Sequence, residues 1–216
     1  KCITVTYMPK VLVADNYPLS RIGLCNSIQT HIPNVELIET SCPLEVIDLL
    51  KERSFNLLIL AVSNPGNNNI DLIKKIKLAH PKVPILLMCI YPENIYGYRA
   101  MSVGASGYVN RETPINDVIT AVKSILKGES YISSTLAKNI ITRINKRSKT
   151  RSIELLSNRE LQILQLMAGG KKPNSIAAET NLSLSTIGTY RQRIFSKLDM
   201  RTDAELTRFA IDNSLI

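Results

Sequence analysis

Five short apolar runs, each followed by a helical pattern, account for the first 128 residues of the chain. The runs are VLVAD (11–15), VELIET (35–40), LLILAV (57–62), PILLMCI (84–90) and GYV (107–109). The helical patterns cover about 18–30, 43–53, 69–79, 93–103 and 114–127. Strands that are apolar nearly throughout and alternate with helices predict a parallel sheet covered on both faces. We therefore expect a five-stranded, doubly wound α/β domain here.

In sheets of this kind the functional site lies beyond the carboxyl ends of the strands. The residues at those ends are Asp15, Asn16, Ala61, Cys89 and Arg111. Their formal charges sum to zero, so a hard divalent cation has little to bind. We expect the Arg111 guanidinium to pair with the Asp15 carboxylate; the alternative is that Arg111 points into solvent. No metal, cofactor or catalytic residue is predicted.

Residues 156–206 carry start and stop signals for three further helices. Ser157 with Glu160 forms a capping box, and Gly169–Gly170 is expected to end the helix that follows. Pro173 suits the first turn of a second helix. Asn181 to Ser183 is expected to form a tight turn, with Ser183 capping a third helix that runs to about Leu198. The pattern predicts a helix-turn-helix.

The third of these helices has an apolar and a polar face. Ile187, Ile194 and Leu198 are expected to face inward. The residues left for solvent or DNA are Ser185, Thr186, Gly188, Thr189, Arg191, Gln192, Arg193 and Lys197. Gln192 can pair with adenine and Thr189 can touch a thymine methyl, whereas Arg191, Arg193 and Lys197 suit phosphates. We predict that this helix reads double-stranded DNA.

The charge distribution agrees with a DNA-binding C-terminal part. Residues 1–130 hold 13 Lys and Arg against 11 Asp and Glu, whereas residues 131–216 hold 14 against 7. A localised positive excess is the footprint of phosphate-backbone binding. Part of this excess precedes the helix-turn-helix, in a stretch that reads as a solvated linker: Arg143, Lys146, Arg147, Lys149 and Arg151.

The C-terminal motif resembles the LuxR/NarL/FixJ family of bacterial transcription regulators, and the resemblance implies a four-helix DNA-binding domain. The matching residues are Leu156, Ser157, Arg159, Glu160, Ile163, Leu164, Gly170, Ile176, Ala177, Ser183, Thr186, Ile187, Lys197, Leu198, Met200, Thr202, Glu205 and Leu206. Gly188 departs from the family, in which a Lys is common at that position. The glycine either lets the helix approach the bases closely or weakens DNA binding.

The segments VLVADNYPL, NLLILAVSNPG, PILLMC and GASGYVNRETP resemble the receiver domain of response regulators. A typical receiver has an acidic pair, a phosphoacceptor Asp, a Ser or Thr, and a Lys at these strand ends, and its carboxylates hold Mg²⁺. Here the corresponding residues are Asp15–Asn16, Ala61, Cys89 and Arg111. Alanine supplies no nucleophile for an aspartyl phosphate. We interpret the site as a degenerate, non-phosphorylatable receiver.

Three function classes follow from these observations. The favoured one is a phosphorylation-independent, DNA-binding transcription regulator that forms a homodimer through its receiver-like domain. The alternative is a partner that forms a heteromer with another regulator and binds DNA weakly. A phosphotransfer receiver is the third, and Ala61 counts against it.

The expected domains are 9–128 (receiver-like), 129–150 (linker) and 151–216 (helix-turn-helix). The linker pattern at 133–146 predicts an amphipathic helix whose apolar face, which includes Leu136 and Ile144, needs a partner. Some relatives bind cyclic di-GMP through an aromatic-apolar-polar-Arg motif, and the stretch at 131–134 lacks the Arg.

The family resemblance implies a bacterial protein, and composition points to the cytoplasm. No run approaches the roughly 18–20 apolar residues of a membrane span, and KCITVTYMPK is too polar for a signal peptide. Cys2, Cys25, Cys42 and Cys89 have no C-x-x-C spacing, so disulfides and zinc are not expected.

Overall fold

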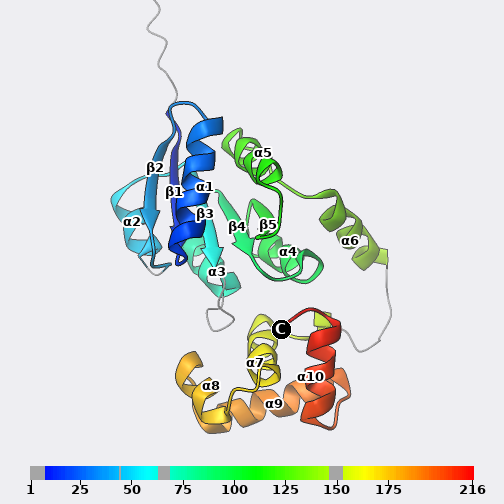
Figure 1. Cartoon of the computed structure of the whole chain (residues 1–216). Helices are drawn as coiled ribbons and strands as arrows, with labels where there is room; N and C mark the ends of the chain where they lie inside the picture. Colours follow the sequence, from blue (N-terminus) through cyan, green and yellow to red (C-terminus); the bar gives the residue numbers. More distant parts are fainter. Residues whose placement is uncertain (1–7, 44, 63–68, 146–152) are drawn as a thin grey trace, which may run out of the picture. The chain divides into compact units, whose positions relative to one another are not determined.

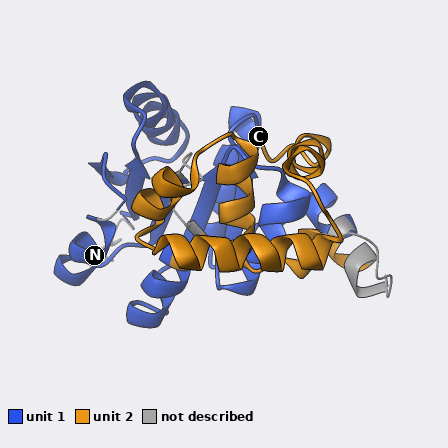
Figure 2. Cartoon of the chain, turned by 90° about the horizontal axis from the view of Figure 1, so that it is seen from below, with its two compact units in different colours: residues 1–63, 72–138 blue, residues 64–71, 139–216 orange. Residues whose placement is uncertain are grey.

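The structure is a computed structural model that describes residues 8–43, 45–62, 69–145 and 153–216. The chain divides into two compact units, residues 1–63 with 72–138 and residues 64–71 with 139–216 (Figure 2). Several predicted features lie outside the described residues, namely Cys2 and the basic residues Lys146, Arg147, Lys149 and Arg151. Within the described part of the chain, no helix is long and apolar enough to cross a membrane.

The first unit is the predicted five-stranded parallel sheet (Figure 1). Its strands are β1 (Lys10–Asp15), β2 (Glu36–Thr40), β3 (Leu57–Val62), β4 (Ile85–Cys89) and β5 (Gly107–Asn110). They are arranged in the order β2-β1-β3-β4-β5. The chain therefore adds β2 on one side of β1 and then adds β3, β4 and β5 on the other side. This confirms the doubly wound α/β fold that the uninterrupted apolar runs predict.

Helices cover both faces of this sheet (Figure 1). They are α1 (Pro18–His31), α2 (Val46–Glu52), α3 (Asn69–Ala79), α4 (Glu93–Ser102) and α5 (Ile115–Leu126). Helices α1 and α5 share one core with alternate residues of the central strands, including Val11, Val13 and Ile59. The helix expected at 43–53 begins three residues later, because Thr40 bonds Cys42 and Glu45 and holds that segment in a turn.

The linker helix α6 (Ser134–Asn145) begins against the first unit. Ser133 Oγ accepts the backbone N–H of Leu136 (3.0 Å) and donates to the Glu93 carboxylate of α4 (2.7 Å). Leu136 is fully buried, and its methyl groups would lie 2.9 Å from a Cβ placed on Gly97 of α4. The predicted apolar face of α6 therefore contacts α4 first, at a position where any side chain larger than that of glycine would press on the Leu136 methyl groups.

The second unit contains the predicted four helices, preceded by a 3-10 turn, Ile153–Leu155. They are α7 (Asn158–Ala168), α8 (Pro173–Thr180), α9 (Leu184–Leu198) and α10 (Asp203–Asp212). Their core includes Ile163, Ile176, Ile194, Leu198 and Ala210, all fully buried. Helix α7 packs on both α9 and α10, and α8 packs on α9.

Local signals set these helix ends as expected. The Ser157–Glu160 capping box is formed, Pro173 is in the first turn of α8, and Ser183 Oγ accepts the Thr186 N–H. Asn181, with φ of 53°, makes the turn between α8 and α9. Of the two glycines expected to end α7, only Gly170 is left-handed (φ 78°), and Gly169 remains near helical φ.

Candidate functional site

The structure gathers the predicted strand-end residues at one edge of the sheet. Asp15 is the last residue of β1 and lies opposite Ala61 in the register with β3. Cys89 ends β4, and its carbonyl accepts the backbone N–H of Arg111 (2.9 Å). Asn16 follows Asp15 and is exposed. The carboxyl ends of parallel strands meet at one edge, so residues from four separate segments become neighbours.

Arg111 and Asp15 form the predicted ion pair. Arg111 Nη2 lies 2.8 Å from Asp15 Oδ1, and the Asp15 side chain is fully buried while that of Arg111 is 16% exposed. A second guanidinium nitrogen, Nη1, donates to Ser20 Oγ at 2.7 Å, and the guanidinium lies 5.2 Å from the centre of the Tyr17 ring. A buried carboxylate needs such a partner because an isolated charge is costly to desolvate. The alternative in which Arg111 points into solvent is wrong.

Two residues of α1 complete this arrangement and were not predicted as part of it. Arg21 Nη1 donates to the Asp15 carbonyl at 2.6 Å and Arg21 Nε pairs with Glu39 at 3.1 Å. Ser20 contacts Arg111 directly. Both lie in the helix that follows β1, and a polar Ser-Arg pair in its first turn is the sequence signal that could have identified them.

The oxygen donors at this edge do not match Mg²⁺, which prefers octahedral coordination by several oxygens. Asp15 supplies the carboxylate, and its Oδ1 already accepts from Arg111 and from the Tyr17 N–H at 2.9 Å. Asp15 Oδ2 and Arg111 Nε are buried and lack hydrogen-bond partners within the described ranges. Within those same ranges no group of three or more His, Cys, Asp or Glu side chains is placed to hold a metal ion.

Cys89 and Tyr108 are both buried beneath this edge. Burial raises the pKa of the Cys89 thiol, which favours an inert thiol over a reactive thiolate. Tyr108 is fully buried, and its hydroxyl donates to the Tyr91 carbonyl at 2.5 Å. Asn110 Nδ2 donates to the same carbonyl at 3.0 Å. This hydrogen bond holds the Tyr108 side chain in a buried rotamer, and an outward rotamer would require the bond to break.

In the second unit, α9 presents the predicted polar face to solvent. Ile187, Ile194 and Leu198 are buried, as expected. Ser185, Gly188, Thr189, Gln192 and Arg193 are exposed, and Thr186 is half-buried. The helix begins at the Ser183 cap, whose hydroxyl satisfies one of the free N–H groups of the first turn. A capped helix with small and amide side chains on its open face has the form of a helix that enters a DNA groove.

Two cations of this face that the sequence left for solvent or DNA are also paired with carboxylates, and both stay partly exposed. Lys197 Nζ lies 2.7 Å from Glu160 Oε2 of α7, and Arg191 Nη2 lies 2.9 Å from Asp203 Oδ1. The Arg191 guanidinium also lies 4.3 Å from the centre of the Phe195 ring. Neither acidic partner was predicted, because these contacts depend on how α7 and α10 cross α9. Arg193, by contrast, is exposed and lies 6.0 Å from the Tyr190 ring.

Glu160 joins the capping box to this face of α9. Burial alone would raise the pKa of Glu160, but hydrogen bonds from Lys197 and Ser157 outweigh it and hold the pKa below its usual value. One carboxylate therefore caps α7 and anchors α9. Its match to the family motif predicts the cap, and the link to Lys197 comes only from the structure.

A receiver-type sheet followed by a four-helix helix-turn-helix unit defines a class of two-domain regulators, and comparisons with known proteins agree. The model of the response regulator receiver domain matches residues 11–123, and that of bacterial regulatory proteins of the luxR family matches residues 154–210. The response regulator UvrY of Escherichia coli (strain K12) is 31% identical over 210 residues, covering 96% of both chains.

Two further similarities extend over nearly the whole chain. The response regulator GacA of Pseudomonas protegens is 28% identical over 211 residues, covering 97% of this chain and 98% of GacA. The structure of promoter-bound RcsB from Salmonella enterica serovar Typhimurium, with the phosphomimetic BeF3−, superposes with a TM-score of 0.72. It is 24% identical and covers 94% of this chain and 98% of RcsB. The chain belongs to the luxR family of response regulators, which are DNA-binding transcription regulators.

Proposed function

We propose that this response regulator acts on DNA without being phosphorylated. The observation that carries the proposal is the pair formed by Arg111 and Asp15 beside Ala61. An aspartyl phosphate needs a carboxylate nucleophile at the Ala61 position, and a methyl group cannot attack phosphorus. The metal that would offset the phosphoryl charge also lacks its ligands, because the single carboxylate is already paired with a guanidinium.

Intact-mass measurement after incubation with acetyl phosphate and Mg²⁺ tests this proposal. The mass of the full chain should remain unchanged, and a gain of one phosphoryl group would contradict the proposal. A combined variant, Asn16→Asp, Ala61→Asp, Cys89→Thr and Arg111→Lys, restores the typical set and serves as the control expected to gain that mass. Ala61→Asp alone should not gain it, because Arg111 still holds Asp15.

We propose that α9 enters the major groove of operator DNA and that Gly188, Thr189 and Gln192 face the bases. Gln192 suits adenine, and the Thr189 methyl suits the methyl group of thymine. Arg193 is an exposed cation on this face that suits a phosphate, as do Arg191 and Lys197 in part, and Lys172 lies at the start of α8. Genome-wide footprinting of the unmodified protein should reveal paired half-sites about one helical turn apart. Binding that appears only after phosphorylation would overturn the proposal.

We further propose a homodimer formed through the receiver-like domain, with domains at 9–128 and 151–216 joined by a linker at 129–150. Support comes from α1, where Leu19 is 86% exposed and Ile22 is 51% exposed. These residues lie one helical turn apart and present apolar surface that a second subunit could cover. Light scattering of the full chain should give the mass of a dimer.

A second candidate function is a heteromeric partner of another regulator that binds DNA weakly. The observations that favour it are the Arg191–Asp203 and Lys197–Glu160 pairs, which engage two cations of the α9 face, and the absence of a side chain at Gly188. A chain that is monomeric and shows no DNA affinity at low salt would favour this second function over the first.

A further inference from the structure

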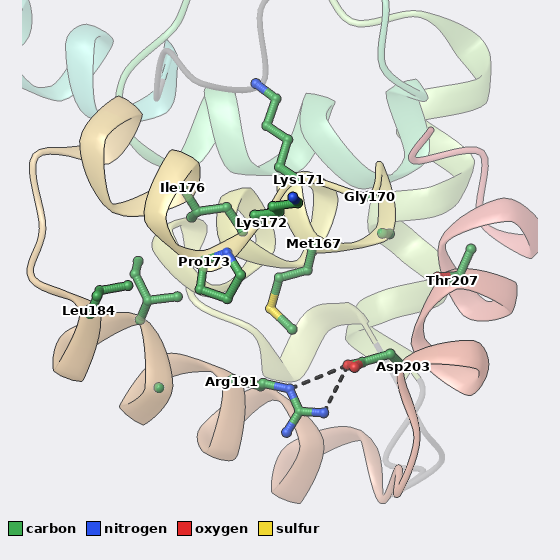
Figure 3. Close-up of a pocket in the computed structure, with 13 residues that line it drawn as sticks. Met167, Gly170, Lys171, Lys172, Pro173, Ile176, Leu184, Arg191, Asp203 and Thr207 are labelled. Atoms are coloured by element: carbon green, nitrogen blue, oxygen red, sulfur yellow. Dashed lines mark hydrogen bonds and ion pairs between the residues drawn. The ribbon is translucent and has the colours of Figure 1, made fainter.

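The helix-turn-helix unit contains a cavity of about 450 Å³ between α7, α8, α9 and α10 (Figure 3). Its volume falls within the range of roughly 300–1,000 Å³ that is typical of small-molecule sites. The walls are mostly apolar, and Met167, Pro173, Ile176 and Leu184 converge on it from three helices. Leu184 is 52% exposed, so one apolar wall is open to solvent.

The cavity reaches the open face of α9 at Gly188. Gly188 lines the cavity, and a Cβ placed on it would meet no atom within 4 Å. Glycine within a helix costs about 1 kcal/mol relative to alanine, and nothing in the surrounding packing requires it here. A larger side chain would project into free space at this point. The cavity and the proposed base-reading face therefore share this position.

Cationic side chains outnumber carboxylates along the wall of this apolar cavity, where Asp203 is the acidic residue among the lining residues. Lys172 lies on its wall and is exposed, and no carboxylate in the described part of the chain lies within ion-pair distance of it. Helix α8 begins at the wall with Pro173, so the positive end of its dipole is directed there. Arg191 also lines the cavity, and its pair with Asp203 (2.9 Å) is exposed enough to exchange for another anion.

We propose that this cavity binds an amphipathic organic anion, with its apolar body between Met167, Ile176 and Leu184 and its charged group at Lys172. The second part of the proposal, which rests on the proposed DNA-binding function, is that occupation competes with DNA. Gly188 and Arg191 belong both to the cavity wall and to the face assigned to DNA. A bound anion would fill the space beside Gly188 and engage the cations that DNA phosphates need.

Titration of the full chain with the fluorescent apolar anion 1-anilinonaphthalene-8-sulfonate tests the site directly. Wild type should show saturable binding at one site. Two substitutions that fill the cavity from opposite walls, Gly188→Leu and Thr207→Leu, should each weaken binding at least about tenfold. Gly23→Leu is the matched control, since Gly23 is also helical and exposed and a Cβ there meets no atom within 4 Å. Equal dye affinity in all four proteins would overturn the proposed site.

Displacement of the dye tests the charge requirement. Decanoate should displace it at least about ten times more effectively than decan-1-ol, and Lys172→Ala should remove most of that difference. Equal displacement by the two compounds in the wild type would overturn the assignment of an anion.

Fluorescence anisotropy with a short labelled DNA duplex tests the competition. Decanoate should weaken the DNA affinity of the wild type and should have no effect on that of Thr207→Leu. If decanoate binds the cavity and DNA affinity is unchanged, the competition is overturned while the site stands. If no duplex binds even at low salt, the proposed DNA-binding function fails, and with it the competition, while the dye titration still decides the site.

Discussion

Asp15 is a fully buried carboxylate whose charge is balanced by Arg111. Removing one partner of a buried pair leaves the other uncompensated, which typically costs about 3–5 kcal/mol. We expect Arg111→Ala to lower the free energy of unfolding of the receiver-like domain by about 3 kcal/mol. Denaturant unfolding followed by circular dichroism measures this change.

The control for this prediction is Arg208→Ala, because Arg208 is 85% exposed and its nearest carboxylate oxygen on Asp212 is 3.9 Å away. Loss of such a surface pair should change stability by no more than about 0.5 kcal/mol. The double variant Asp15→Ala with Arg111→Ala should recover part of the loss, since no buried charge remains. Equal effects of Arg111→Ala and Arg208→Ala would show that the buried pair contributes nothing to stability.

Glu160 should make the stability of the helix-turn-helix unit dependent on pH in the acidic range. Its pKa is lower in the folded protein than in the unfolded chain, so the stabilisation it provides is complete above its ordinary pKa of about 4.3. That stabilisation is lost as the pH falls through the lowered folded value, so the unit should weaken below about pH 4. In Glu160→Gln this dependence should be reduced. Urea unfolding at a series of pH values measures it, with Asp212→Asn as the exposed control.

At the residue scale, the sequence predicts contacts that follow directly from topology. Asp15 and Arg111 were predicted to meet because both lie at carboxyl ends of strands in one parallel sheet and carry opposite charges, and the 2.8 Å pair confirms it. The pairs Lys197–Glu160 and Arg191–Asp203 could not be predicted in this way. They depend on the crossing of packed helices, which apolar periodicity leaves undetermined.

At the scale of elements, the packing of α6 against α4 depends on Gly97. An alanine there would bring Cβ to 2.9 Å from the Leu136 methyl groups, but these are the ends of a side chain that can shift slightly. Alanine also gains about 1 kcal/mol of helix propensity, so Gly97→Ala should be close to neutral. Gly97→Leu leaves no space for Leu136 and should release the start of α6.

Hydrogen exchange of residues 134–138 measures this release. Protection of the α6 amides should fall in Gly97→Leu and remain in Gly97→Ala, whereas Gly23→Leu adds the same side chain in open space on α1. Unchanged protection of the α6 amides in Gly97→Leu would mean that the start of α6 does not depend on the contact between Leu136 and Gly97.

The second prediction for an element concerns α1. If Leu19 and Ile22 form the dimer interface, Leu19→Glu should shift the full chain from dimer to monomer. Leu19 is 86% exposed, so the monomer itself should keep its stability within about 0.5 kcal/mol. Light scattering across a range of concentrations measures the mass. Leu78→Glu is the matched control, because Leu78 of α3 is 77% exposed.

Strand existence and helix caps were the most predictable features at this scale. Uninterrupted apolar runs such as 57–60 are fully buried, and the Ser157 and Ser183 caps form as expected. The three-residue delay of α2 was missed because side-chain bonds around Thr40 override the helical pattern. The contact of Leu136 with Gly97 was missed because an apolar stripe does not reveal its partner.

At the scale of the whole molecule, the positive C-terminal part should make DNA affinity strongly salt-dependent. The logarithm of the association constant should fall linearly with the logarithm of salt concentration, and Arg193→Ala should reduce the slope by about one. Arg208→Ala should leave it unchanged. Acetyl phosphate should alter neither affinity nor slope in the wild type. Anisotropy titrations at a series of salt concentrations measure these affinities and slopes.

The Arg111–Asp15 pair also has a consequence for how long a regulatory response lasts. In a regulator that carries an aspartyl phosphate, the active form has a limited lifetime, because the site itself sets the rate at which the phosphate is hydrolysed. Under the proposed function, with Arg111 paired with Asp15 and Ala61 at the acceptor position, the chain would have no such bond to hydrolyse. Under the proposed function, a response would end only when the protein is diluted by growth, degraded or sequestered. The duration of the response would then be set by cell growth and protein turnover rather than by phosphate hydrolysis.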